Sequence, residues 1–474
     1  MSGITQEILE LFNEINKVPR CSKNESGISD WLVNWAAKNG FSTKRDEALN
    51  VVIEVPASPG FEKKPIVILQ GHMDMVCEKT PDSGHDFSKD PIESYIDGEW
   101  LKAKGTTLGA DDGIALAIAL TIAKKMKHPP LELLFTVDEE TGLTGATSLD
   151  PQMLKGKILM NIDSEDEGVF TIGCAGGRDS KIELSLKLEK TRIEKAYKVR
   201  ISGLQGGHSG IDIDKPKANA NILLARLLKE MFENTKLGII DIKGGSAHNA
   251  IPRNAEAIVT VEDPEKCLKI VEDFEKIFKN EHGEYEPTLK CTFEEVEETY
   301  ERMVSIEATK KLIELMLAMP HGVLSYSKEI KGLVETSNNF ATVEIQNEKL
   351  RISSSQRSSK LSKLDFITKK IEAVAILAGA EVKSGKGYPA WEPNFESNLL
   401  KQSLKVYKDT FGTEAKVEVI HAGLECGIIG SKYEDMEMIS LGPTVKYPHS
   451  PKEKLFIPSI EKLWKFFEKF FEAL

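Results

Sequence analysis

Short apolar runs recur along the first ~180 residues, and most of them end in polar or acidic residues. Four such runs are expected to form strands, and they cover residues 51–55, 66–75, 131–137 and 157–163. Residues 113–128 are apolar on nearly every face, which predicts a helix buried against a sheet rather than a surface helix. This alternation of strands and helices predicts an α/β fold.

The pattern changes after about residue 187. Segments that alternate charged and apolar residues, and long polar helices such as residues 264–280, replace the apolar runs. Residues 386–474 then return to the first pattern. We therefore predict a discontinuous α/β domain, formed by residues 1–187 and 386–474, with an inserted domain of residues 188–385.

Length and charge narrow the possible partners. A chain of 474 residues exceeds the usual size of one hydrophobic core, which agrees with two or three packed units. The formal net charge of −12, without a dense stripe of Lys and Arg, argues against a nucleic-acid surface. No stretch approaches the roughly 20 apolar residues of a membrane span, and the N-terminus lacks the pattern of a signal peptide. We therefore expect a cytoplasmic protein that binds neither nucleic acid nor membrane.

The cysteines agree with that expected location. The chain has six cysteines and no C-x-x-C pair, so reduced thiols are the simplest expectation for all of them. The six are Cys21, Cys77, Cys174, Cys267, Cys291 and Cys426.

The apolar run at residues 66–75 ends with a histidine and an acid two positions apart. Because alternate residues of a strand point to the same face, His72 and Asp74 leave the sheet on one side. A neutral imidazole is a good zinc ligand, and a nearby carboxylate can fix the orientation of its ring. For this motif alone, a strand end with a solvated histidine and aspartate is the alternative.

Glycines surround the second candidate motif. Gly105, Gly109 and Gly113 flank Asp111 and Asp112, directly before the expected buried helix. Glycine-rich turns can bring a carboxylate to a crowded point, where Asp111 could give one oxygen to each of two cations. Alternatively, the two aspartates could cap the N-terminus of the helix.

Three consecutive acids follow the strand of residues 131–137, which is unusual because like charges repel unless something cationic neutralises them. Of these acids, Glu139 and Glu140 point in different directions, so one could bind a metal while the other faces the attacking water. Asp163 ends the last of the four expected strands, and His449 lies in a Pro-flanked loop near the C-terminus. Taken singly, the three acids could form a solvated acidic turn, and His449 could be an ordinary loop histidine.

These candidate residues are stronger evidence for a metal site together than singly, because ligands gather at the edge where the strands of an α/β sheet end. Two cations that share one carboxylate, with one histidine and one further carboxylate each, need five protein ligands. Such nitrogen and oxygen donors suit zinc, and cobalt or manganese could also fit. A cation pair can activate a water and polarise a carbonyl group. The five candidate ligands are His72, Asp111, Glu140, Asp163 and His449.

The motifs QGHMDM, GADDGIA, DEETG, NIDSEDEG and PHSP together resemble those of the di-zinc aminoacylase/carboxypeptidase superfamily of metallopeptidases. Longer stretches such as NIDSEDEGVFTIGCAGG, GLQGGHSGIDI and GYPAWEPN are similar to the Xaa-His (aminoacylhistidine) dipeptidases of that superfamily, which act on β-alanyl-histidine. The matching stretches run from about residue 16 to residue 455, nearly the whole chain. Competing motifs are poor, since the chain has neither a G-x-x-x-x-G-K-[ST] loop nor a G-x-S-x-G motif.

The resemblance implies two zinc ions in a catalytic domain that has a mixed sheet with helices on both faces. It assigns His72, Asp111 and Asp163 to the first ion, and Asp111, Glu140 and His449 to the second. Asp74 would orient the imidazole of His72, and Glu139 would be the general base. The peptide bond between Asp111 and Asp112 would be cis.

The resemblance further implies that the insertion is an α+β lid with substrate contacts. His208, between glycines, would donate to the carbonyl oxygen on which negative charge builds up. Arg357 offers the planar fork that a C-terminal carboxylate accepts, with Asn249 as a donor beside it. In the catalytic domain, Glu425 is the candidate for binding the substrate amine.

The reaction that we infer is hydrolysis of a small peptide substrate, an unblocked dipeptide of the Xaa-His type. Glu139 would take a proton from the attacking water and pass it to the leaving amine. One alternative is a deacylase or a broad di- or tripeptidase on the same scaffold. Another is a metal-binding protein without catalysis, although such a site would need neither Glu139 nor Asp74. The lid could pair two copies in a homodimer, or fold one half over the other in a monomer.

Overall fold

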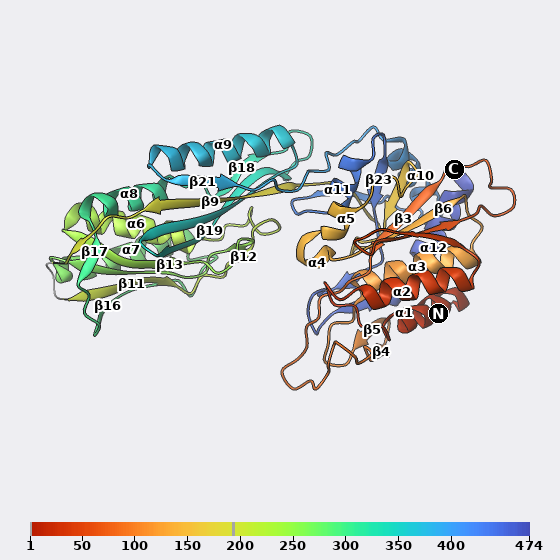
Figure 1. Ribbon diagram of the computed structural model, residues 1–474, viewed down its shortest axis with the longest axis horizontal. Helices are drawn as coiled ribbons and strands as arrows, with labels where there is room; N and C mark the ends of the chain where they lie inside the picture. The colour runs from red at the N-terminus through yellow and green to blue at the C-terminus, as the bar shows by residue number, and fades with distance from the viewer. Residues whose placement is uncertain (1, 192–194) are drawn as a thin grey trace. The chain divides into compact units, whose positions relative to one another are not determined.

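The computed structural model describes residues 2–191 and 195–474, and the chain divides into two compact units (Figure 1). The first unit comprises Met1–Cys174, Trp391–Val419 and Leu424–Leu474, and the second comprises Ala175–Ala390 and Ile420–Gly423. The predicted fold class, a discontinuous α/β unit with an α+β insertion, is confirmed. The units divide after residues 174 and 390, whereas the sequence pattern placed the boundaries after residues 187 and 385.

A mixed eight-stranded sheet forms the centre of the first unit, in the order β1-β2-β6-β3-β7-β23-β8-β22. β3 pairs in parallel with β6 and β7, and β23 pairs in parallel with β7, whereas β2 pairs antiparallel with both β1 and β6. The strands are β1 (Ser42–Arg45), β2 (Val51–Val55), β3 (Val67–His72), β6 (Leu131–Thr136), β7 (Ile158–Asn161), β8 (Val169–Cys174), β22 (Lys416–Ile420) and β23 (Glu437–Ser440). A second sheet has the order β24-β25-β5-β4 and contains β4 (Ser94–Asp97), β5 (Trp100–Ala103), β24 (Val445–Lys446) and β25 (Lys454–Phe456).

The parallel register brings three strand ends to one edge of the large sheet. His72 at the end of β3 lies opposite Thr136 at the end of β6. Gln70, two residues earlier, lies opposite Asn161 at the end of β7. The acidic segments that follow β6 and β7 therefore begin beside His72, at the edge where ligands bind in sheets of this kind.

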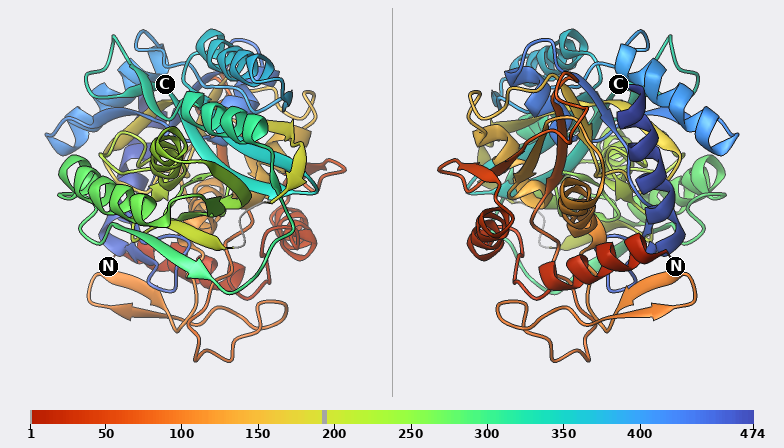
Figure 2. Two further views of the ribbon diagram at one scale, coloured as in Figure 1. Left: turned by 90° about the vertical axis from the view of Figure 1, so that its left-hand side faces the viewer. Right: turned by 90° about the vertical axis from the view of Figure 1, so that its right-hand side faces the viewer.

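Helices cover both faces of this sheet (Figure 1). α3 (Ala110–Lys125) is buried along nearly its whole length, which confirms the predicted buried helix. It packs so closely beneath β3 that a Cβ on Gly71 would lie 2.9 Å from the Cβ of Ala115. Figure 2 (right) shows α1 and α12, from the two ends of the chain, side by side. The other helices of this unit are α1 (Gly3–Ile15), α2 (Ser26–Lys38), α4 (Glu139–Gly142), α5 (Thr144–Ser148), α10 (Asn398–Phe411), α11 (Glu425–Lys432) and α12 (Ile457–Ala473).

The second unit is built on a nine-stranded sheet in the order β16-β11-β15-β13-β19-β20-β9-β21, with β18 paired to β19. Its strands are β9 (Gly176–Ser185), β11 (Ala196–Ser202), β13 (Leu237–Gly244), β15 (Ala255–Val261), β16 (Lys290–Val296), β18 (Gly322–Tyr326), β19 (Val334–Gln346), β20 (Lys349–Ser358) and β21 (Glu381–Ser384). Two short ribbons accompany it, formed by β10 (Leu188–Lys190) with β17 (Arg302–Val304) and by β12 (Gly207–His208) with β14 (Ala250–Ile251).

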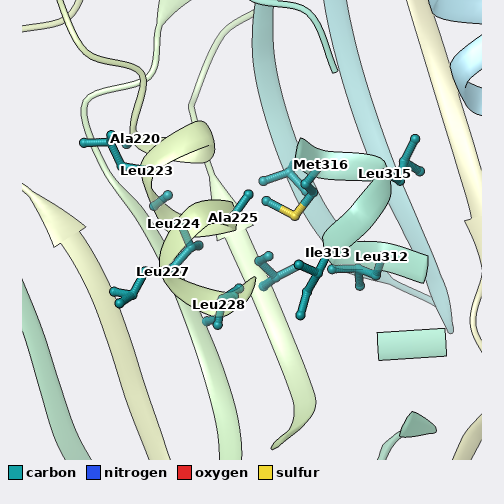
Figure 3. Packing of buried hydrophobic residues seen from close by; sticks show 14 of the residues in the cluster. Ala220, Leu223, Leu224, Ala225, Leu227, Leu228, Leu312, Ile313, Leu315 and Met316 are labelled. Carbon is teal, nitrogen blue, oxygen red and sulfur yellow. The ribbon is translucent and has the colours of Figure 1, made fainter. Parts of the chain in front are cut away.

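The helices of the second unit are α6 (Ala220–Asn234), α7 (Pro264–His282), α8 (Ile306–Ala318) and α9 (Leu361–Leu377). They pack against the nine-stranded sheet, and leucines of α6 interdigitate with Ile313 and Met316 of α8 (Figure 3). Their apolar residues recur at helical spacing, which buries one stripe of each helix.

The second unit repeats one topology twice. β11-α6-β13-β15-α7-β16 and β9-α8-β19-β20-α9-β21 are both successions of the type βαββαβ. The two halves of the sheet meet where β13 pairs with β19. From this centre outwards, the strands of each half follow the same order: the second strand of the succession comes first, then the third, the first and the fourth. The first succession lies entirely between β9 and α8 of the other. This nesting is why no tandem repeat is visible along the sequence.

The expectation of six reduced thiols is wrong for two of the cysteines. Cys21 and Cys77 form a disulfide, with their Cα atoms 5.7 Å apart. The pairing follows from the fold, because Cys21 forms a parallel bridge with Met75 and so lies beside the segment that follows β3. The other four cysteines are buried and are not part of this bond. None of the helices in the described ranges is long and apolar enough to cross a membrane.

The disulfide closes a loop of 56 positions, so its loss should destabilise the folded chain through the entropy of the unfolded state. We expect the double variant Cys21→Ser, Cys77→Ser to lose about 4 kcal/mol of unfolding free energy. Urea unfolding monitored by circular dichroism measures this, and the wild-type protein with and without a reducing agent is the matched control. An unchanged unfolding midpoint in both comparisons would contradict the prediction.

Candidate metal centre and substrate residues

Five side chains of the first unit meet at the sheet edge where β3, β6 and β7 end. They come from five segments that are far apart in the sequence. His72 ends β3, Asp111 opens α3, Glu140 lies in α4 directly after β6, Asp163 follows β7, and His449 lies in the loop after β24. The structure thus brings together all five ligands that were predicted from the sequence.

Asp111 lies between the two histidines. Its Oδ1 atom is 3.1 Å from Nε2 of His72, and its Oδ2 atom is 3.1 Å from Nε2 of His449. The two oxygens of one carboxylate therefore face two different imidazoles. This is the arrangement expected of a carboxylate that bridges two cations.

Each histidine also faces one further carboxylate. Nε2 of His72 is 3.5 Å from Oδ1 of Asp163, and Nε2 of His449 is 2.9 Å from Oε2 of Glu140. Two groups result, each with one imidazole, one carboxylate of its own and one oxygen of Asp111. They match the two ligand sets that the resemblance implied.

Asp112 is a further acid at this centre. Its ligand atoms lie within 4.8 Å of those of His72 and Asp163, so Asp112 is close enough to bind a cation with them. However, its Oδ2 atom accepts the backbone N–H of His72 at 3.2 Å, which directs the carboxylate beneath β3. The backbone of Asp111 and Asp112 is not helical, so α3 kinks at these residues. The carboxylate of Asp112 accepts the N–H of His72 instead of capping the turns that follow. The peptide bond between Asp111 and Asp112 is cis, as the resemblance implied.

The electrostatics of the centre favour bound cations. Burial opposes protonation of His72, but hydrogen bonds with Asp111 and Asp163 outweigh it and raise the pKa of the imidazole well above its ordinary value. Hydrogen bonds with Asp111 and Glu140 raise the pKa of His449 to about 11. Both imidazoles are thus held by an excess of negative charge. A divalent cation would satisfy that excess and would leave the imidazoles neutral, as metal binding requires.

One buried acceptor at the centre supports the same fit. Oε1 of Glu140 has no hydrogen-bond partner among the described residues, although burying an unpaired carboxylate oxygen is costly. Imidazole and carboxylate donors in these numbers suit zinc, cobalt or manganese. The residues present therefore fit a pair of divalent cations.

Asp74 lies behind the metal ligands. Its Oδ1 atom is 3.3 Å from Nδ1 of His72, the ring nitrogen that points away from Asp111. Asp74 also accepts the backbone N–H groups of Glu139 at 3.1 Å and Glu140 at 3.4 Å. A single buried carboxylate therefore lies against one histidine and accepts the first two N–H groups of α4. This position is compatible with the positioning role expected of Asp74.

Of the three consecutive acids, Asp138 has a structural role. Its backbone N–H donates to Glu25, and its carboxylate accepts the hydroxyl groups of Thr141 and Thr144. Glu139 lies among the candidate metal ligands, where burial and the neighbouring carboxylates raise its pKa well above the ordinary value. A carboxylate with a raised pKa is a better proton acceptor, as a general base requires.

Glu425 is held by residues that the sequence analysis did not identify. Its Oε2 atom accepts hydrogen bonds from Gln70 and Thr136, each at 2.7 Å, and Asn161 holds Gln70 in turn at 2.6 Å. Oε1 of Glu425 is buried, and no residue in the described ranges is its hydrogen-bond partner. Burial raises the pKa of this carboxyl to about 7. The polar residues Gln70 and Asn161 in buried strands were the available signal.

Arg357 lies in the second unit, at the end of β20. It is only 7% exposed, so it is not an ordinary surface cation. Its guanidinium donates to the hydroxyl oxygen of Tyr388 at 2.9 Å, and its Nε atom finds no hydrogen-bond partner in the described part of the chain. Tyr388, from the GYPAW segment, was not identified as a functional residue from the sequence.

His208 forms part of the β12–β14 ribbon of the same unit. Its Nδ1 atom accepts the backbone N–H groups of Gly210 and Ile211, each at 3.2 Å. Burial and the charge of Arg357 lower the pKa of His208 below its ordinary value, which keeps the ring neutral. The proton of the neutral ring therefore resides on Nε2, which leaves a hydrogen-bond donor.

Asn249 and His208 both line a cavity of about 670 Å³ in the second unit. Asn339 fixes the loop that carries Asn249, because its side chain donates to the carbonyl oxygen of Ala250 at 2.8 Å. Nearby, His421 hydrogen bonds with Ser337 at 2.7 Å, and burial and the charge of Arg357 lower its pKa to about 3. His421 was missed because HAGLEC drew attention only to its acid.

The chain is similar to known peptidases over nearly its whole length. The profile described as peptidase family M20/M25/M40 matches residues 68–473. The chain is 39% identical over 464 residues to the cytosol non-specific dipeptidase of Escherichia coli (strain K12), covering 97% of this chain and 96% of that protein. The crystal structure of an aminoacylhistidine dipeptidase from Vibrio alginolyticus superposes with a TM-score of 0.89 at 38% identity, covering 100% and 98% of the two chains. An aminopeptidase from Bacillus cereus, with a TM-score of 0.58 and 16% identity over 99% and 98% of the chains, shares the fold.

The shared carboxylate makes a specific prediction about cation stoichiometry. Asp111→Ala should abolish binding of both cations, because Asp111 faces both histidines, whereas His449→Ala should abolish binding of only one. Cobalt titration followed by metal analysis of the dialysed protein gives the number bound per chain. Asp82→Ala, at an exposed acid, is the control and should bind two cations like the wild type. Two cations on the Asp111→Ala variant would rule out the bridging role.

Proposed function

Because the chain belongs to peptidase family M20/M25/M40, we propose that it is a dipeptidase that uses two zinc ions to hydrolyse unblocked dipeptides. The observation that carries this proposal is the position of Asp111, with one oxygen facing each of two histidines. A pair of such groups beside the half-buried Glu139 is suited to hydrolysis by an activated water.

When bound, the two cations would polarise the scissile carbonyl and increase the acidity of the attacking water. Glu139 would accept the proton of that water and then donate it to the leaving amine. Asp74 would keep His72 in one orientation through its contact with Nδ1.

We propose that the substrate is recognised by its two charged ends. Glu425 would bind the α-amino group, since its buried Oε1 atom has no other partner among the described residues. Arg357 would bind the C-terminal carboxylate, and Asn249 would donate beside it. His208 would donate through Nε2 to the carbonyl oxygen as negative charge develops there. Recognition of both ends selects dipeptides over acylated amino acids and longer peptides.

Two relatives suggest different substrate ranges for this chain. The Escherichia coli relative is named a non-specific dipeptidase, and the Vibrio alginolyticus structure is named an aminoacylhistidine dipeptidase. We propose that dipeptides with a C-terminal histidine are among the substrates. Comparing turnover of β-alanyl-histidine, Leu-Gly and N-acetylated amino acids, each with zinc, cobalt or manganese, separates this proposal from a broad dipeptidase and from a deacylase.

We also propose a cytoplasmic location, on the strength of the cytosolic relative. The Cys21–Cys77 disulfide counts against a reducing compartment. Cell fractionation with trapping of free thiols shows whether the protein is in the cytoplasm and whether the disulfide is formed there. A homodimer through the second unit is a further proposal, which sedimentation velocity of the purified protein tests.

The general base should be separable from metal binding. Glu139→Gln keeps the size of the side chain but removes the proton acceptor, so we expect kcat to fall by ~10²–10⁴-fold while both cations remain bound. Steady-state kinetics and metal analysis of the same sample measure the two properties. Glu47→Gln, at an exposed position, is the control. Loss of a cation from Glu139→Gln would instead make Glu139 a ligand.

Arg357 should determine affinity rather than the rate of the chemical step. We expect Arg357→Ala to raise KM for free dipeptides by roughly 10–100-fold, the usual value of a hydrogen bond to a charged group, with a smaller change in kcat. Arg351→Ala provides a matched control, because Arg351 lies in the same strand and pairs with Glu183 at the surface. An amidated dipeptide should show little difference between wild type and Arg357→Ala. Equal losses for the free and amidated peptides would contradict carboxylate binding.

A further inference from the structure

The turn that precedes Asp111 is held by a carboxylate from the other end of the chain. Oε2 of Glu453 accepts the backbone N–H groups of Leu108 at 2.8 Å and Gly109 at 3.0 Å. Oε1 of Glu453 accepts those of Ala110 at 2.7 Å and Asp111 at 3.2 Å. Four successive amides of the turn therefore converge on one side chain.

Arg20 holds the same turn through its carbonyl side. One guanidinium nitrogen donates to the carbonyl oxygen of Gly109 at 2.6 Å. The other donates to the carbonyl oxygens of Met73 at 3.3 Å and Asp74 at 3.1 Å, directly after His72. Arg20 thus joins the turn before Asp111 to the strand end that carries His72.

Glu453 makes the corresponding connection to the other histidine. It lies four residues after His449, and its backbone N–H closes that loop by donating to the carbonyl oxygen of Ser450 at 3.0 Å. Three segments that carry ligands are therefore connected through two buried side chains of opposite charge. Arg20 is 1% exposed and Glu453 is 3% exposed.

This connection meets a specific need of the metal centre. The carboxylates of Asp111, Glu140 and Asp163 repel one another, so flexible loops would let Asp111 move away from the position between the histidines. Backbone hydrogen bonds to Glu453 fix the turn without occupying any ligand atom. If Glu453 served only the stability of the fold, it would not need to accept four successive amides. All four belong to the turn that carries Asp111, the ligand shared by both cations.

We propose that Glu453 and Arg20 are positioning residues that hold the Leu108–Asp111 turn so that Asp111 presents one oxygen to each cation. Glu453 acts mainly on the cation at His449, because it fixes both the Asp111 turn and the loop that carries His449. Arg20 acts mainly on the cation at His72, because it fixes the same turn to the end of β3. Only the expected effect of these residues on turnover rests on the proposed function. Their expected effect on cation binding does not.

Cation titration of the whole protein tests this assignment directly. Glu453→Gln has nearly the same shape as the wild type, but its amide nitrogen would face N–H donors of the turn. We expect the dissociation constant of one cobalt ion, the one at His449, to rise by ~10–100-fold, so that it becomes the weaker of the two; this is the usual effect of losing a residue that orients a metal ligand. The visible absorption of bound cobalt should change with it, and kcat should fall more than KM changes.

Two further variants keep the test decisive if Glu453→Gln does not fold. Glu453→Asp retains the charge but is one methylene shorter, so we expect it to fold and to bind the weaker cobalt ion with intermediate affinity. Glu468→Gln, an exposed glutamate of α12, is the matched control and should bind cobalt like the wild type. Wild-type cobalt affinities in both Glu453 variants would overturn the proposal.

A double variant tests which cation Glu453 serves. In a His449→Ala background, where one cobalt ion remains, adding Glu453→Gln should change the remaining dissociation constant by less than about threefold. Adding Arg20→Lys in the same background should weaken that ion by at least roughly tenfold. Equal effects of the two substitutions would overturn the assignment. Because these measurements need no substrate, two bound cations without dipeptide turnover would refute the proposed function alone.

Discussion

The first unit depends on keeping several carboxylates close together at one edge of a sheet. Asp111, Glu140 and Asp163 lie within a few ångströms of two histidines, and Glu139 and Asp74 add further negative charge. Such a cluster is unfavourable in a folded protein unless cations neutralise it. The parallel pairing of β3 with β6 and β7 creates the cluster, and the backbone contacts of Asp74, Glu453 and Arg20 maintain it.

The five candidate ligands could be selected from the sequence because each one lies in a local pattern that is visible along the chain without the fold. His72 ends an apolar run, Glu140 and Asp163 follow two others, and Asp111 lies in a glycine-rich turn before a buried helix. The α/β class follows from the same alternation, since strands that end in polar residues share one edge. His449 was the weakest prediction alone, because nothing near it in the sequence distinguishes it from an ordinary loop histidine.

Features that depend on long-range pairing could not be predicted in the same way. Cys21 and Cys77 show no motif, and only the bridge between Cys21 and Met75 brings them together. The hydrogen bonds of Glu425 require the neighbouring strands β3 and β6, which no spacing along the chain reveals. The nested topology of the second unit is hidden for a similar reason, because one βαββαβ succession interrupts the other. The first boundary of the compact units differs from the expected one, because the composition changes only after β9 has ended.

The two units differ in the charge of the functional groups that each of them carries. The first contributes acids and two imidazoles whose pKa values the acids raise, whereas the second contributes Arg357 with His208 and His421, whose pKa values are lowered. A dipeptide at neutral pH has a positive amino end and a negative carboxyl end, separated by one peptide bond. An acid such as Glu425 suits the first end, and a guanidinium such as Arg357 suits the second. A blocked substrate would lack one of these charges and would leave a buried ionisable group unpaired, which is the stronger form of discrimination available to a binding site.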